Sequence, residues 1–304
     1  MPHLSQRQPE SESPTQDHPH LEQEKEKLDW MISQLSEAEI EAAARVNYDY
    51  LFLQGGPNSP FSSEERITYA KHICHRYLES KKGNENVALT KVQATLKFRK
   101  EMDVEGLVAA FDDTNDSPTN DYAFQLEKHL SSQHMFVQGY DRELRATFFF
   151  IPRRVKHHHP EWSIKEALYT MERAIACSKC LPDKSINAIC DFKDFSIKNA
   201  PPLDVGQQFL TSLRSHYAGQ VHKIFLVDAP TSFRLLWNLL KGFVGTNTRS
   251  KIIFVSGKHK DRVLGEYYDP SQLPDFLQGT KTRELNLQEY LHEARFDQAF
   301  DEKE

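Results

Sequence analysis

Two short apolar runs flank a strongly amphipathic segment in the last third of the chain. Ile224–Val227 and Ile252–Val255 are continuously apolar, which is typical of strands covered on both faces in a parallel or mixed sheet. Between them, apolar residues recur at three- and four-residue spacing, which predicts a helix with one wide apolar face. These residues are Phe233, Leu236, Trp237, Leu240 and Val244. The segment therefore predicts a strand, a helix and a second strand in succession.

The alternation of strands and helices extends upstream to about residue 122. Apolar runs predict strands over 147–151 and 186–192, and amphipathic patterns predict helices over 123–129, 164–176 and 205–215. A last exposed helix is expected over 285–296. Strands that alternate with helices favour the α/β class, in which parallel strands are joined by right-handed crossovers.

The first part of the chain has a different, helical pattern. Residues 1–27 lack aromatic side chains and are rich in polar residues, so this stretch is predicted to be disordered. Ser36 and Glu39 have capping-box spacing in a helix expected over 28–53. Further helices are predicted over 67–78, with Ser62 or Ser63 as its cap, and over 86–98. Lys81, Lys82, Gly83 and Asn84 form the turn that joins them.

Charge is distributed unevenly along the 304 residues. The chain has 38 basic and 44 acidic side chains, and residues 61–280 hold 30 basic and 26 acidic ones, so the body is slightly basic between acidic ends. Such a body suits contact with an anionic membrane surface. No apolar run approaches the roughly 20 residues that cross a bilayer. With no secretory pattern and only four scattered cysteines, we expect a cytoplasmic protein that associates transiently and peripherally with membranes.

Motifs of catalysis and metal binding are missing from the pattern. The sequence has no nucleophile elbow, zinc-protease helix or dinucleotide-binding glycine fingerprint. Cys177 and Cys180 have CxxC spacing, but no second pair completes a zinc site. Nucleic-acid binding would require a far more basic body. We therefore expect no enzymatic activity, no metal, no cofactor and no nucleic-acid partner.

Several short motifs, in their order and spacing, resemble the CRAL-TRIO lipid-binding family. They are Gly139-Tyr140-Asp141-Arg142-Glu143 with Arg145, Ala188-Ile189-Cys190-Asp191, Asp228-Ala229-Pro230, Trp237-Asn238, Thr248 to Ile252, and Leu273-Pro274 before Gly279. A weaker similarity to the family's helical N-terminal domain covers residues 67–107. The family includes the yeast-type phosphatidylinositol transfer proteins, α-tocopherol transfer protein and cellular retinaldehyde-binding protein.

The resemblance implies a mixed, largely parallel sheet whose flanking helices enclose a lipid pocket, preceded by a small all-helical domain. It divides the chain into an acidic, largely disordered tail with a short helix at its end (1–46), a helical domain (47–117), a lipid-binding domain (118–282) and an acidic C-terminal helix or tail (283–304). The ligand is expected to be a single phospholipid or other hydrophobic molecule, exchanged or presented at membranes.

In the family, a helix after the Ala-Pro strand gates the pocket, which here corresponds to residues 231–244. The resemblance places nine side chains in the pocket or its gate: Phe148, Phe150, Ile186, Ala188, Phe225, Phe233, Leu236, Trp237 and Leu240. The alternative is that the helical stripe simply packs on the sheet.

The headgroup residues implied by the resemblance point to phosphatidylinositol. Lys251 and Thr248 match the cation and hydroxyl of the phosphoinositide-binding members, and Lys82, with Lys81 beside it, matches a basic residue in the helical domain. Cations and hydroxyls of this kind bind phosphate. Each lysine can instead be an ordinary solvated side chain.

Three positions depart from the family pattern. Gly219 stands where the phosphoinositide-binding members have an acidic residue, and Ile186 and Ala188 replace the polar pair that holds choline lipid. These departures keep two alternatives open: an interaction or membrane-docking module that carries no lipid, and a carrier of a neutral retinoid- or tocopherol-like ligand. Protein partners cannot be predicted from the sequence.

Overall fold

The computed structural model describes residues 18–46, 62–111, 121–156, 159–180, 184–196, 200–280 and 286–292. The predicted disorder of residues 1–17, the end of the helix expected at residue 53, and the domain boundaries near residues 47, 117 and 282 lie outside these ranges.

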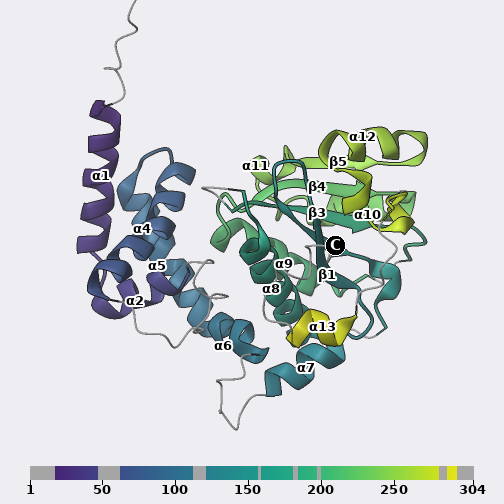
Figure 1. The fold of residues 1–304 in the computed structure, drawn as a ribbon, viewed down its shortest axis with the longest axis horizontal. Helices are drawn as coiled ribbons and strands as arrows, with labels where there is room; N and C mark the ends of the chain where they lie inside the picture. Colours follow the sequence, from purple (N-terminus) through teal and green to yellow (C-terminus); the bar gives the residue numbers. More distant parts are fainter. Residues whose placement is uncertain are drawn as a thin grey trace, which may run out of the picture.

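Four N-terminal helices form a unit beside the sheet domain (Figure 1). They are α1 (His18–Ser33), α2 (Glu37–Arg45), α4 (Ser63–Ser80) and α5 (Glu85–Met102). Capping boxes begin α2 at Ser36 and α4 at Ser62, as their sequences predict. The disorder expected up to residue 27 is wrong for residues 18–27, because α1 begins ten residues earlier than the predicted helix. Its inner side is anchored by Met31, which is fully buried.

A five-stranded sheet, in the order β1-β2-β3-β4-β5, forms the centre of the second unit (Figure 1). The strands are β1 (Met135–Tyr140), β2 (Ala146–Phe150), β3 (Ile186–Asp191), β4 (Val221–Val227) and β5 (Ile252–Val255). β1 pairs antiparallel with β2, and the other neighbours are parallel. The predicted mixed, largely parallel sheet is confirmed, although β1 was not predicted.

Helices cover both faces of this sheet. On one face lie α8 (Pro160–Cys177), α9 (Leu203–His216) and α10 (Thr231–Leu240). On the other, α12 (Lys260–Tyr267) is followed by Tyr268, whose hydroxyl lies 3.1 Å from the Thr147 hydroxyl of β2. Short helical segments connect these elements: α6 (Val104–Val108), α7 (Asp121–Leu130), α11 (Thr246–Arg249), and 3-10 turns at Ala109–Phe111, Pro152–Arg154, Gly257–His259, Pro270–Gln272 and Asp275–Leu277.

The last described helix, α13 (Leu287–His292), packs against the domain and is not the exposed helix that the sequence predicted. Tyr290 and Leu291 are buried, and the Tyr290 hydroxyl accepts a hydrogen bond of 3.1 Å from the Val137 amide of β1. The Arg173 guanidinium of α8 lies 3.7 Å from the centre of the Tyr290 ring. This helix therefore contributes to the core.

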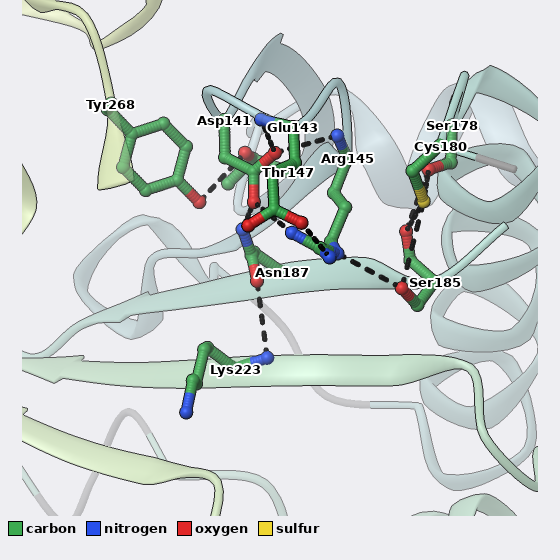
Figure 2. Close-up of polar contacts among 10 residues, drawn as sticks. All are labelled: Asp141, Glu143, Arg145, Thr147, Ser178, Cys180, Ser185, Asn187, Lys223 and Tyr268. Atoms are coloured by element: carbon green, nitrogen blue, oxygen red, sulfur yellow. Dashed lines mark hydrogen bonds and ion pairs between the residues drawn. The ribbon is translucent and has the colours of Figure 1, made fainter. Parts of the chain in front are cut away.

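A buried polar network explains the Gly139–Arg145 motif (Figure 2). The Asp141 carboxylate accepts hydrogen bonds from the Arg145 amide (2.8 Å), the Arg145 guanidinium (3.2 Å) and the Asn187 side-chain amide (2.8 Å). The Asn187 oxygen in turn accepts a bond from the Lys223 amide at 3.2 Å. The network thus fastens the β1–β2 hairpin to β3 and β4, which is a structural role.

Candidate functional site: an apolar cavity under α9 and α10

An apolar cavity of about 230 Å³ lies between one face of the sheet and the helices α8, α9 and α10. Alternate side chains of β2, β3, β4 and β5 form its floor, since successive residues of a strand point to opposite faces. The floor consists of Phe148, Phe150, Ile186, Ala188, Cys190, Ile224, Leu226 and Ile252. Such a space, with few polar groups, suits the hydrocarbon part of a ligand.

Helix α10 covers part of the cavity and is apolar on two sides. Phe233, Leu236, Trp237 and Leu240 line the cavity, as predicted for the gate helix. Leu235 and Leu239 point the other way and are 66% and 60% exposed. Phe254 of the edge strand β5 is 54% exposed, and its ring lies 6.4 Å from that of Trp237. The roof of the cavity therefore has an exposed apolar outer surface.

Eight of the nine residues predicted for the pocket or gate line the cavity, and the ninth, Phe225, does not. Phe225 lies on the opposite face of β4, fully buried, with its ring 5.0 Å from that of Tyr267 and 6.0 Å from that of Tyr268. Its neighbours Ile224 and Leu226 occupy the cavity face instead. The assignment of Phe225 to the pocket is corrected accordingly.

At the β5 side, the cavity is bordered by two polar side chains, Thr248 and Arg214. Thr248 belongs to α11 and was predicted, whereas Arg214 comes from the last turn of α9 and was not. The Arg214 side chain is exposed and passes along Gly245, where its Cγ and Cδ lie 3.3 and 3.2 Å from the position that a Cβ would take. A guanidinium and a hydroxyl at one rim can together bind an anionic group.

Lys251 directly precedes β5 and lies outside the cavity lining. Its Nζ donates a hydrogen bond of 2.5 Å to the Val221 carbonyl at the start of β4. Burial, and then the positive charge of Lys223, lower the pKa of Lys251. Among the described residues, no carboxylate lies within ion-pair distance of this ammonium. Lys251 is thus a half-buried cation without an anionic partner in the described part of the chain.

Lys81 and Lys82 do not line the cavity. They follow α4 in a turn whose Gly83 carbonyl accepts a 2.8 Å hydrogen bond from Lys27 of α1. The helical unit instead reaches the turn before β4 through Arg76, whose Cγ lies 3.5 Å from the position of a Cβ at Gly219. Gly219 therefore has no side chain where the phosphoinositide-binding members have an acidic one. The aliphatic part of Arg76 approaches this position instead.

Besides Ser163 of α8, two further polar side chains border the cavity at its other side, near β1. They are Glu166 of α8 and His134, which precedes β1, and both are buried. Neither residue could be recognised from the sequence, because a lone charged or titratable residue whose orientation is unknown is normally solvated. Only the structure reveals that Glu166 lies on the covered side of α8.

Comparison with known proteins agrees with this architecture. Residues 130–279 match the model of the CRAL/TRIO domain. This segment is a CRAL/TRIO domain. The phosphatidylinositol transfer protein PDR17 of Saccharomyces cerevisiae is 23% identical over 225 residues, which are 72% of this chain and 60% of that protein. The phosphatidylinositol/phosphatidylcholine transfer protein SFH4 of Arabidopsis thaliana is 35% identical over 32% of this chain and 16% of its own.

The crystal structure of Sfh5 has the same fold, with a TM-score of 0.61 over 91% of this chain and 95% of that chain, at 14% identity. The alignments to PDR17 and SFH4 span less than two thirds of those relatives. Within the described ranges, no helix is long and apolar enough to cross a bilayer. The same ranges contain no cluster of three or more metal-ligating side chains.

Proposed function

We propose that this chain binds one amphiphilic lipid in the cavity of its CRAL/TRIO domain and exchanges or presents it at membranes through α10. The observation that carries the proposal is the two-sided apolar character of α10. Its inner side lines an apolar cavity, and its outer side exposes Leu235 and Leu239. A helix with this composition can contact a bilayer and the ligand at once.

Reversible burial of the lipid chains supplies the driving force for binding. Each methylene that leaves water contributes about 0.8 kcal/mol. Movement of α10 is the step that gives the lipid access, and such gating steps commonly limit turnover. No enzymatic step is required. The contact with the membrane is peripheral and transient.

The proposed headgroup is an anionic one of the phosphatidylinositol type. Arg214 and Thr248 border the cavity at the β5 side, and Lys251 follows Thr248 by three residues. The names of the curated relatives also mention phosphatidylinositol. The apolar Ile186 and Ala188 in the cavity floor disfavour a choline headgroup there. Lys81 and Lys82 remain candidates for contact with a headgroup outside the cavity.

The first experiment is native mass spectrometry of the purified chain, followed by extraction and identification of the bound lipid. We expect one phosphoinositide per chain. A neutral isoprenoid or sterol would instead favour the carrier of a neutral ligand. An empty protein, even after incubation with mixed phospholipid vesicles, would contradict the proposal and favour the interaction module.

The gate is tested with Trp237→Glu, which places a carboxylate on the cavity side of α10. We expect at least a tenfold loss of lipid exchange between vesicles, because a buried charge disfavours both the closed gate and the apolar ligand. Phe124→Glu on α7 is the matched control, since Phe124 is 62% exposed and does not line the cavity. Circular dichroism checks that both variants fold. Unchanged exchange by Trp237→Glu would reject α10 as the gate.

A further inference from the structure

The cavity has a second polar end that the anionic headgroup does not use. Glu166 and His134 are each 4% exposed and both border the cavity, where Phe150 and Met135 lie nearby. The Glu166 Oε1 and His134 Nε2 atoms are 3.2 Å apart, and His134 Nδ1 lies 2.8 Å from the Ser132 hydroxyl. These contacts fix the imidazole between a carboxyl group and a hydroxyl.

The second carboxyl oxygen of Glu166, Oε2, is buried and has no hydrogen-bond partner among the described residues. With the imidazole N–H at Nε2 donating to Oε1 of the ionised carboxylate, Oε2 is a hydrogen-bond acceptor. Buried polar atoms are nearly always paired, so an unpaired acceptor at the edge of an apolar cavity calls for a donor.

The two polar ends of the cavity lie diagonally across the sheet. Thr248 precedes β5, at the edge where the parallel strands begin, whereas Phe150 and Cys190, on the side of Glu166 and His134, lie where β2 and β3 end. Neighbouring strands are about 4.8 Å apart, so the three spacings between β2 and β5 amount to about 14 Å. A lipid with its headgroup at Thr248 can therefore place the far end of its buried part near Glu166.

Access to Oε2 requires a small rearrangement, because neighbouring side chains cover this atom. Met135 and Met171 both line the cavity and are the flexible side chains of this region. Methionine has three rotatable bonds and readily adapts to a ligand. Both side chains can therefore adapt to a ligand that enters this end of the cavity.

We infer that the buried end of the cavity recognises an aliphatic hydroxyl of the bound lipid, which donates its hydrogen bond to Glu166 Oε2. This inference rests on the proposed function, because it specifies the ligand of the same cavity. The hydroxyl belongs either to the far end of an acyl chain or to a cyclic lipid alcohol, and the two sources share the same donor.

Two matched pairs of probes test the inference with the full chain. The first pair is methyl palmitate and methyl 16-hydroxypalmitate, and the second is cholestene and cholesterol, each measured by displacement of a fluorescent fatty acid. We expect the hydroxylated member of at least one pair to bind about tenfold more tightly. A preference in the first pair assigns a hydroxylated chain. A preference in the second assigns a cyclic alcohol and replaces the phosphatidylinositol-type headgroup with a neutral ligand.

Glu166→Leu removes the acceptor and should abolish this preference while both members of the pair still bind. Glu161→Leu on the same helix is the matched control, since Glu161 is exposed and pairs with Lys165 outside the cavity. Equal binding of both members by the unsubstituted protein would overturn the inference and leave the proposed function intact. Failure of every probe to bind, together with failure of phosphatidylinositol to displace the fluorescent fatty acid, would contradict the proposed function itself. If Glu166→Leu does not fold, the comparison of the two members of each pair in the unsubstituted protein tests the inference by itself.

Discussion

Lys251 is a partly buried cation that lies close to a second positive charge. Its ammonium is half-buried and bonded to the Val221 carbonyl, and the nearby Lys223 adds a second positive charge. Both burial and Lys223 lower the pKa of Lys251. An anion bound beside it would stabilise the charged form and reverse this effect. The side chain is thus suited to an anionic ligand.

Lys251→Ala is expected to weaken transfer of phosphatidylinositol about tenfold, because a hydrogen bond to a charged group contributes about 1.5–3 kcal/mol. Transfer of an uncharged lipid should be unaffected. A vesicle assay with each lipid separates the two effects. Lys97→Ala is the control, since the Lys97 side chain is 77% exposed on α5. An equal loss for both lipids would mean that Lys251 acts only by holding β4 against β5.

Sequence reasoning could identify the apolar character of the cavity residues but not always their side of the sheet. Ile224, Phe225, Leu226 and Val227 are all apolar, so the pattern gives no alternation that would exclude Phe225. Phe225 pairs with Ile189 of β3 and Ile224 pairs with Ala188, and this register decides which face each side chain takes. Arg214 and Glu166 lie on helices whose orientation toward the sheet cannot be deduced from the sequence, so no local pattern marked either as bordering the cavity.

Helix α10 shows how one element can serve two environments. Its inner aromatic residues pack with Phe192 and Phe195, and the rings of Phe192 and Phe233 are 4.0 Å apart. Its outer leucines have no cover among the described residues. Exposed apolar side chains that lie together mark an interaction surface more often than isolated ones do. The outer side of α10 is therefore the expected membrane contact.

Replacement of both Leu235 and Leu239 by glutamate should slow lipid exchange at least fivefold without loss of the lipid already bound. The two charges oppose insertion into an anionic bilayer, but they lie on the side of α10 away from the cavity. Vesicle flotation and mass spectrometry of the bound lipid measure the two properties separately. Leu21→Glu on α1, where Leu21 is 62% exposed, is the matched control. Loss of the bound lipid would show instead that these leucines hold the gate closed.

Most helices and the parallel strands could be predicted because their apolar residues follow a regular pattern along the sequence, as in α8 and α9. β1 could not, because Gln138 and Gly139 interrupt its apolar run. Gly139 has φ of 71°, and a Cβ there would lie 2.1 Å from the Gln272 carbonyl oxygen, so the glycine is required by tertiary contact. Burial of α13 likewise depends on Val137 and Arg173, which are far away in the sequence.

The two units of the molecule meet at a joint that combines ionic and aromatic contacts. Arg99 of α5 donates a hydrogen bond of 2.7 Å to the buried carboxylate of Glu172 in α8, which also accepts one from the Tyr217 hydroxyl. Phe98 stacks on His216 at the end of α9, with ring centres 4.1 Å apart. Because α9 also lines the cavity, the helical unit supports the wall of the proposed lipid site.

His216 should make this joint sensitive to acid. Burial, and then the charge of Lys91, lower the pKa of His216 from 6.5 to about 4, so the imidazole is neutral in the folded state at neutral pH. Between these two values the unfolded chain binds more protons than the folded one. The contribution of His216 to stability is therefore complete above pH 6.5 and is lost as the pH falls toward 4. Because the His216 side chain is partly exposed, solvent screening reduces the loss in the free energy of unfolding to about 1 kcal/mol at pH 5.

Denaturant unfolding at pH 7 and pH 5 measures this contribution. Between pH 7 and pH 5, the free energy of unfolding should fall by about 1 kcal/mol more in the unsubstituted protein than in His216→Gln. Val92→Ala is the matched control, because Val92 is fully buried on the same helix α5 and carries no polar or titratable group. It should lower stability at both pH values and keep the full pH dependence. An identical fall in the protein and in His216→Gln would show that protonation of this imidazole does not open the joint, and the acid sensitivity would then have to come from another group.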